Sequence, residues 1–274
     1  MTKAEKRIEN RFHTTLNKLL KAIRKFVGTA QEPEEILERL KLYSSSKAFQ
    51  DWCESLALNM TTQVKKSVDA TWHESLLRVG RRNELYSAIV RELETPNGGV
   101  FFGLVRQNAE MIKTFPLDVS EEVTRLVANA ELQGRRASDI AAELSERFPD
   151  IAKSRLELIA RTEVSKTQSE LTQARAASLG LDWYIWRASK DARVRSSHDF
   201  MDGVLVNWND PPNPEALDPK SGQKPYGKYH AGNTFNCRCD EEVIVDLDYV
   251  DFPARVYRNN TIIQMTRAAF EEIM

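Results

Sequence analysis

The chain has few cysteines, no long apolar run and almost no net charge. Three cysteines in 274 residues are too few for the disulfide framework of a small secreted domain, and an odd number cannot all be paired. No apolar run approaches the roughly 18–20 residues that span a bilayer. Residues 1–16 also lack the apolar core of a signal peptide. We therefore expect no membrane segment and a chain that starts in the cytoplasm.

The chain also lacks an excess of basic or of acidic side chains. The chain carries 39 basic and 40 acidic side chains, a formal net charge of −1, so we do not expect a uniformly basic nucleic-acid-binding protein. Hydrophobic residues make up 41% of the chain, which is enough for a core and too much for wholesale disorder.

The first 28 residues are the most basic segment, with eight basic and two acidic side chains. Apolar residues recur there at steps of three and four, which predicts a helix with one apolar stripe and a basic opposite face. One interpretation is a solvated helix packed on its own domain. The other is a helix that docks on an acidic partner or on DNA. The side chains assigned to docking are Lys18, Lys21, Arg24 and Lys25.

Residues 1 to about 180 contain little glycine and proline and have helical periodicity. The break signals are Ser120 as a helix start, Gly134 as an interruption, and Pro149 and Gly180 as helix ends. We expect helices over 34–42, 47–58, 62–79, 119–131, 138–147 and 152–179.

After Gly180 the sequence favours strands, over 183–186, 204–206, 237–247 and 254–259. The segment 209–227 holds five of the ten prolines and is expected as a long irregular loop, a kind of segment that often carries function. The predicted fold class is α+β, with a mainly helical N-terminal region followed by a small mixed domain that contains strands. Trp183, Trp186 and Trp208 are expected in the core of that small domain.

Four polar clusters stand in the second half of the chain. They are Ala160–Glu163, Asp191–His198, Met201–Gly203 and Asn236–Cys239. Their order and spacing resemble the Mu F-like minor head protein family of tailed bacteriophages over roughly residues 119–247. One departure is Val194, where that family commonly has threonine. The resemblance implies a Mu F-like domain over 119–255, between a helical region 1–118 and a C-terminal tail 256–274.

Cys237 and Cys239 alternate with Arg238, so that on a strand both thiols would face the same side. A disulfide at this spacing would be strained. Together with His198 and His230 the two thiols could complete the four ligands of a structural zinc ion. The alternative is that both cysteines are small buried hydrophobic residues and that His198 hydrogen-bonds to a carboxylate.

Asp191, Arg193 and Arg195 also occupy every second position along the chain. We expect a buried network of arginine–carboxylate pairs; the alternatives are a phosphate or ligand pocket and a catalytic acid–base site. No nucleophile elbow, phosphate-binding loop or metalloprotease motif is present in the sequence, and we expect a protein that is not an enzyme. The residues assigned to the network are Arg161, Glu163, Asp191, Arg193, Arg195, Asp202 and Asn236.

The family resemblance implies a minor structural protein of a phage head, made in the host cytoplasm and found in the head interior or at the portal vertex. Its partners would be the portal protein, the scaffold and major capsid proteins, and packaged DNA. Two other classes stay open. One is a DNA-binding virion protein that uses the basic N-terminal helix, and the other is a metal-dependent enzyme or effector carried in the particle.

Overall fold

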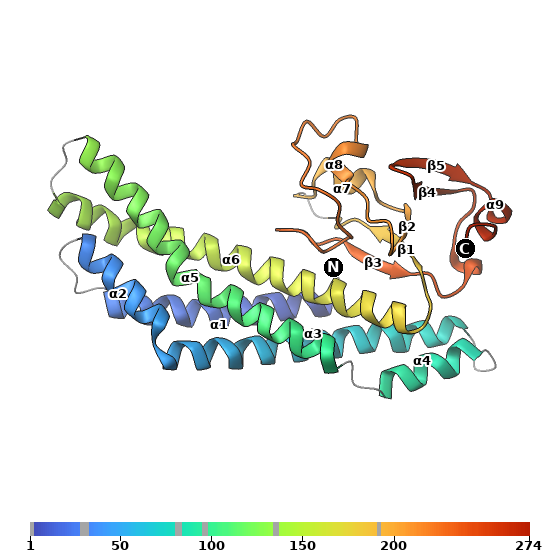
Figure 1. Ribbon diagram of the computed structural model, residues 1–274, viewed down its shortest axis with the longest axis horizontal. Helices are drawn as coiled ribbons and strands as arrows, with labels where there is room; N and C mark the ends of the chain where they lie inside the picture. Colours follow the sequence, from blue (N-terminus) through green and yellow to red (C-terminus); the bar gives the residue numbers. More distant parts are fainter. Residues whose placement is uncertain (1–2, 28–32, 80–83, 95–97, 134–136, 191–192) are drawn as a thin grey trace. The chain divides into compact units, whose positions relative to one another are not determined.

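A computed structural model describes residues 3–27, 33–79, 84–94, 98–133, 137–190 and 193–274. In the described residues six helices precede the sheet, and Figure 1 labels them along the chain. They are α1 (Lys3–Val27), α2 (Pro33–Ser45), α3 (Lys47–Val79), α4 (Glu84–Glu94), α5 (Gly98–Leu132) and α6 (Ala137–Ser178). A helical region followed by strands confirms the predicted α+β class. None of the described helices is long and apolar enough to cross a membrane.

Several helices run past the breaks that the sequence predicts. Helix α5 continues through Ser120, which is buried within it rather than capping a new helix. Helix α6 continues through residue 149, where we expected an end. Both predictions were wrong because local break signals are weaker than the packing of a long apolar face.

Contacts divide the chain into two compact units. The first comprises residues 1–6, 63–101 and 164–274, and the second comprises residues 7–62 and 102–163. This division passes through the long helices. The domain bounds at residues 118 and 255 stay a prediction.

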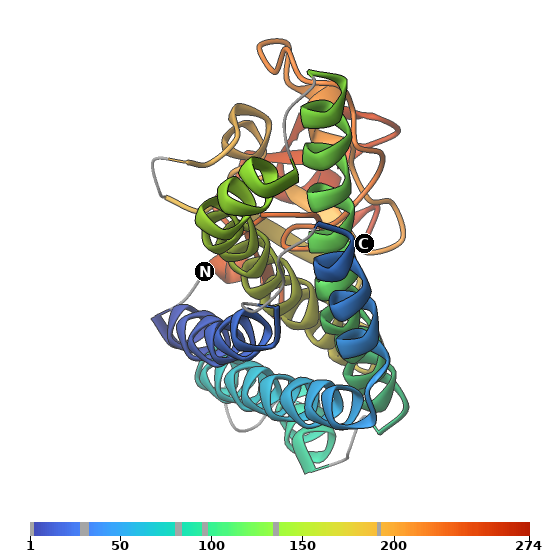
Figure 2. The same ribbon diagram turned by 90° about the vertical axis from the view of Figure 1, so that its left-hand side faces the viewer.

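The second unit is a helical core built on the apolar stripe of α1. Figures 1 and 2 show α1 alongside the first half of α3. Phe12, Leu16 and Ile23 are at most 3% exposed. Asn108 Nδ2 of α5 donates to Thr61 Oγ1 of α3 at 3.1 Å, so a polar pair is satisfied inside this core.

The first unit holds a five-stranded sheet with strand order β3-β1-β2-β4-β5. All neighbours are antiparallel except β2 and β4, which pair in parallel through Leu205 and Val256. The strands are β1 (Trp183–Arg187), β2 (Leu205–Asn207), β3 (Asp240–Val243), β4 (Ala254–Arg258) and β5 (Thr261–Met265). Short helices α7 (Ser196–Phe200), α8 (Pro214–Leu217) and α9 (Arg267–Glu271) and a 3₁₀ turn (Leu247–Tyr249) complete the described part.

Alternation along β1 separates the two faces of the sheet. Trp183 and Ile185 pack in an apolar cluster with Val256 and with Phe270 of α9. Tyr184 and Trp186 are fully buried on the other face, and Trp208 packs on Tyr184 with 4.3 Å between ring centroids. The prediction that the three tryptophans belong to the core is confirmed.

The C-terminal strands and helix α9 contribute to this core. Strands β4 and β5 pair over five residue pairs from Ala254↔Met265 to Arg258↔Thr261. Phe270 is fully buried, and its ring centroid lies 4.9 Å from that of Trp183. The segment around Phe270 is short and rich in charged side chains. The sequence alone therefore does not show that Phe270 is buried against the sheet.

Candidate metal centre

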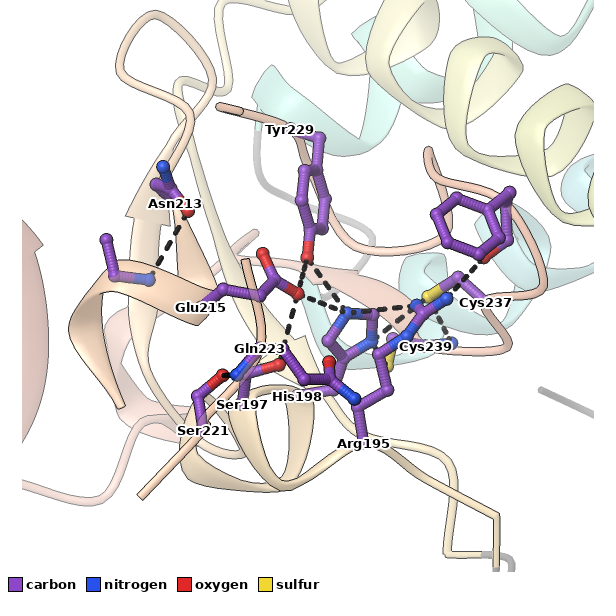
Figure 3. Close-up of polar contacts among 12 residues, drawn as sticks. Arg195, Ser197, His198, Asn213, Glu215, Ser221, Gln223, Tyr229, Cys237 and Cys239 are labelled. Carbon is purple, nitrogen blue, oxygen red and sulfur yellow. Dashed lines mark hydrogen bonds and ion pairs between the residues drawn. The ribbon is translucent and has the colours of Figure 1, made fainter. Parts of the chain in front are cut away.

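One buried group of metal-binding side chains lies between α7 and the loop that precedes β3. His198 comes from α7, and Cys237 and Cys239 come from the loop, as Figure 3 shows. His198 Nδ1 lies 3.4 Å from the Sγ atom of each cysteine. All three side chains are 2% exposed, and their ligand atoms lie within 4.8 Å of one another.

The loop backbone brings the two thiols together. The cysteines precede β3, which begins at Asp240, so the strand alternation expected for them was wrong. Asn236 instead has a left-handed backbone with φ 56°, a conformation that asparagine tolerates better than most residues. The chain turns there, and the amide of Cys239 then donates to Cys237 Sγ at 3.4 Å. We therefore assign Asn236 a backbone role.

Gly232 allows the close approach that this loop needs. Its φ is +74°, and a Cβ atom there would lie 3.0 Å from the carbonyl oxygen of Cys239. Any larger residue would combine a strained backbone with a contact against main chain that cannot move aside. The position of the second thiol therefore depends on a glycine five residues before the first.

A chain of hydrogen bonds leads away from the other ring nitrogen of His198. Tyr229 Oη lies 3.0 Å from His198 Nε2 and donates to Glu215 Oε1 at 2.6 Å. Ser197 Oγ donates to the same carboxylate oxygen at 3.2 Å (Figure 3). Because the Tyr229 proton goes to Glu215, the Tyr229 oxygen accepts from Nε2–H. Nδ1, the nitrogen that would bind a metal, faces the two sulfurs.

The electrostatics of the group match this arrangement. The hydrogen bond from the Cys239 thiol, with a further contribution from His198, holds the pKa of Cys237 well below its usual range despite burial. The same hydrogen bond, followed by burial, raises the pKa of Cys239. One thiolate and one thiol therefore share a proton. Burial, and then Glu215, raises the pKa of Tyr229, which keeps its hydroxyl a donor.

The donor set fits zinc. Two thiolates and one imidazole are ligands that zinc prefers, and a histidine ligand commonly donates its second N–H to a carboxylate or another outer group. With Zn–S and Zn–N bonds of about 2.3 and 2.0 Å, a tetrahedral site separates sulfur and nitrogen by roughly 3.5 Å. The observed sulfur–nitrogen separations of 3.4 Å are close to that distance.

His230 does not join the group, contrary to its assignment as the fourth ligand. Its Nδ1 lies 3.1 Å from Tyr184 Oη, and its ring packs edge-on against Trp208 at 5.1 Å between centroids. Burial lowers the pKa of His230 to about 4. Among the described residues, the metal-binding group contains His198, Cys237 and Cys239 alone.

A family model described as Phage Mu protein F like protein matches residues 121–241. Residues 121–241 belong to the Phage Mu protein F-like family. The matched segment holds the whole His198, Cys237 and Cys239 group together with Tyr229 and Glu215, and it ends two residues into β3. Strands β4 and β5 and helix α9 follow it.

Two relatives are similar to longer parts of the chain. An uncharacterized protein of Haemophilus influenzae is 30% identical over 160 residues, which are 58% of this chain and 32% of that protein. The chain thus spans about a third of that relative. Minor head protein GP7 of Bacillus phage SPP1 is 22% identical over 262 residues, 90% of this chain and 83% of that protein. No solved structure matches the chain.

The residues expected as one ionic network take separate places in the Mu F-like segment. Asp202 pairs with Lys190 and accepts from the amide of Ala188 at 2.9 Å. Next to it, Gly203 has φ +80° and donates from its amide to the carbonyl of Trp186 at 2.8 Å, so the Asp-Gly pair forms the turn between α7 and β2.

The arginines also differ in their surroundings. Arg195 Nη2 donates to the carbonyl of Phe235 at 2.9 Å, and its guanidinium lies over the rings of Phe235 and Tyr226. Arg161 pairs with Glu9 at 3.6 Å. Arg193 is exposed and Glu163 is buried, whereas Asp191 lies outside the described residues.

Sequence reasoning missed Ser197, Glu215 and Tyr229. Their signal was indirect, because Glu215 lies inside the proline-rich segment that was expected to carry function. Only the fold shows that this segment brings a carboxylate back to His198.

The docking residues lie on α1, as expected from its pattern. Lys18, Lys21 and Lys25 are exposed, on the opposite side from the buried stripe. The side chain of Arg24 lies outside the described residues.

Proposed function

We propose that the protein is a minor structural component of a tailed-phage head that associates with the portal vertex. The observation that carries this proposal is the alignment with the SPP1 minor head protein over 90% of this chain and 83% of that one. The Mu F-like match at residues 121–241 supports the same class. The partners would be the portal protein, and the scaffold and major capsid proteins during assembly. We retain the expectation that the protein is not an enzyme.

The basic face of α1 is the surface that we propose for docking. Its apolar stripe is buried, so the helix is held in place while Lys18, Lys21 and Lys25 stay exposed. Such a face favours an acidic surface of the portal or the DNA backbone. DNA binding through the same face is the second candidate function.

The metal centre would keep the Mu F-like segment folded. His198, Cys237 and Cys239 would hold zinc, which would then link α7 to the loop before β3 across 39 residues of chain. The ion would supply the stability that a small sheet with little core lacks. Tyr229 and Glu215 would orient the imidazole and keep its Nδ1 deprotonated.

Co-expression with the portal protein of the same phage genome, followed by sedimentation of the portal ring, tests the proposal. We expect the full chain to sediment with the ring at moderate salt. A variant with Lys18→Glu, Lys21→Glu and Lys25→Glu should stay at the top of the gradient. A matched variant changes three exposed lysines elsewhere, Lys47, Lys66 and Lys153, to glutamate and should still sediment.

Free wild-type protein at the top of the gradient would contradict portal association. Binding of duplex DNA that weakens steeply with salt, and that only the α1 variant loses, would favour the second candidate function instead.

A further inference from the structure

Trp186 carries a buried indole N–H group for which the metal-free structure shows no acceptor. The residue lies in β1 and is fully buried, and its Nε1 atom has no hydrogen-bond partner in the described parts of the chain. A buried donor without an acceptor is costly, and most buried donors in folded proteins are paired. This N–H group therefore calls for an acceptor close to it.

The ring of Trp186 packs directly on the candidate metal centre. Its centroid lies 5.7 Å from that of His198, with the two ring planes at 83°, and 6.3 Å from that of Tyr229. The hydrogen bond with Cys237 and burial raise the pKa of Cys239, and donation from the Trp186 indole acts in the opposite direction. Only a donor close to the sulfur has that effect, so Cys239 Sγ is the acceptor within reach of the indole.

The protonation of Cys239 explains why the hydrogen bond is not complete without a metal. The Cys239 thiol donates to the Cys237 thiolate, and a thiol sulfur is a weak acceptor. Metal ligation requires both cysteines as thiolates. A thiolate carries a full charge and accepts an N–H hydrogen bond much more strongly. Metal binding would thus turn Cys239 into the acceptor that the indole lacks.

The charges of the group suit a divalent ion with such donors around it. Two thiolates balance two positive charges, and the imidazole of His198 would bind in its neutral form, so the buried site would carry no net charge. The amide of Cys239 already donates to Cys237 Sγ at 3.4 Å. The indole of Trp186 would add a side-chain donor to the other sulfur. Outer groups of this kind orient metal ligands and strengthen metal binding.

We propose that Trp186 is a positioning residue of the metal centre, whose indole N–H donates a hydrogen bond to the Cys239 thiolate when a divalent metal such as zinc is bound. The bond forms only if that centre holds a metal, so the inference rests on the metal centre proposed above. Trp208 offers a matched comparison. Its Nε1 atom is also buried without a partner among the described residues, but its ring packs on Tyr184 and His230.

Nuclear magnetic resonance of the full chain, with nitrogen-15 in the indoles of its five tryptophans, tests the hydrogen bond directly. The probe is cadmium-113, a spin-active divalent ion that binds thiolates. We expect cadmium to move the Trp186 indole proton downfield and to couple to it through the N–H···S bond. The Trp208 indole proton should show no such coupling. Contacts of the indole proton with the rings of His198 and Tyr229 assign the Trp186 signal without any variant.

Two variants measure what the hydrogen bond contributes. Trp186→Phe keeps an aromatic ring and removes the donor, and we expect it to weaken zinc affinity about tenfold in competition against a chelator. In the cobalt(II) protein it should also move the sulfur-to-cobalt charge-transfer band to lower energy, because the thiolate loses a donor. Trp208→Phe should keep the wild-type affinity and band. A packing defect alone would lower the Tm without moving the band.

The outcomes separate this inference from the metal centre itself. Wild-type protein that binds cadmium with neither a shift nor a coupling at the Trp186 indole would overturn the hydrogen bond and leave the centre standing. An unshifted cobalt band in folded Trp186→Phe would also overturn it. Wild-type protein that binds neither cadmium nor cobalt would overturn the centre and the hydrogen bond together. Portal association is decided separately, by sedimentation.

Discussion

The hydroxyl of Tyr229 donates a 2.6 Å hydrogen bond to Oε1 of Glu215, and both side chains are buried. This bond fixes the role of the Tyr229 oxygen. It makes the Tyr229 oxygen an acceptor for His198 Nε2–H and leaves Nδ1 facing two sulfurs. A residue pair that touches no ligand atom therefore prepares the side chain that would bind the metal.

Tyr229→Phe should weaken zinc binding about 10–100-fold, because the imidazole loses the group that orients it. Competition of the purified protein against a chromogenic chelator measures this affinity. Tyr226→Phe is the matched control, since Tyr226 is 47% exposed and has no bond to His198 or Glu215. Equal affinity of Tyr229→Phe and wild type would show that the hydroxyl does not position His198.

Protein purified without an affinity tag should contain close to one equivalent of zinc, and Cys237→Ser should contain less than about a tenth of an equivalent. Removing the metal with a chelator should lower the Tm of the wild type by several degrees and leave that of Cys237→Ser unchanged. Cys53→Ala serves as the control because Cys53 is buried in the other unit, and it should keep its zinc. A wild-type protein without zinc after zinc-supplemented expression would refute the metal centre.

His230 should make the fold sensitive to mild acid. Burial lowers its pKa from 6.5 to about 4, so the folded state keeps it neutral after the unfolded state has taken up a proton. Stability is therefore complete above pH 6.5 and falls as the pH drops toward 4, by up to about 1.4 kcal/mol per pH unit. Urea unfolding at several pH values should show that His230→Gln flattens this slope.

The matched control for that experiment is His73→Gln, because His73 is exposed. It should keep the wild-type slope between pH 6.5 and 4. If His230→Gln kept that slope as well, another group would have to carry the acid sensitivity.

Asp69→Ala should destabilise the first unit by about 3 kcal/mol. Asp69 Oδ1 accepts from Arg175 Nη2 at 2.6 Å, and Arg175 is only 2% exposed, so the change leaves a buried cation without its carboxylate. Chemical denaturation measures the loss. Asp51→Ala removes the exposed Lys47–Asp51 pair and should cost less than about 1 kcal/mol. Equal losses of stability in the two variants would show that the buried Arg175–Asp69 pair contributes no more than an exposed pair does.

Local pattern was enough to predict the first helix with its buried face and several of the other helices and strands. The apolar stripe of α1 follows from a 3.6-residue period, and the strand around Trp183 follows from β-favouring residues bounded by Gly180. The helix face and the strand both depend on residues that are close together in the sequence. The pairing of the two cysteines with His198 was also predicted, because two closely spaced thiols and a nearby imidazole are ligands that zinc prefers.

Where the signal depends on distant residues, prediction from sequence failed. The helix end expected at residue 149 is absent because α6 continues through it, and the burial of Phe270 depends on Trp183 and Val256, which lie outside its own segment of the chain. His230 has the right chemistry for the metal group, but the chain directs its ring to Tyr184 and Trp208.

The sequence by itself determined the α+β class, the amphipathic first helix and the cysteine pair of the candidate metal centre, since each depends on residue types at short spacing. Only the tertiary structure decided that Glu215 and Tyr229 lie beside His198. The physical reason is that a hydrogen bond or an ion pair needs contact within a few ångströms. Residues far apart in the chain reach that distance only once the helices and strands have packed.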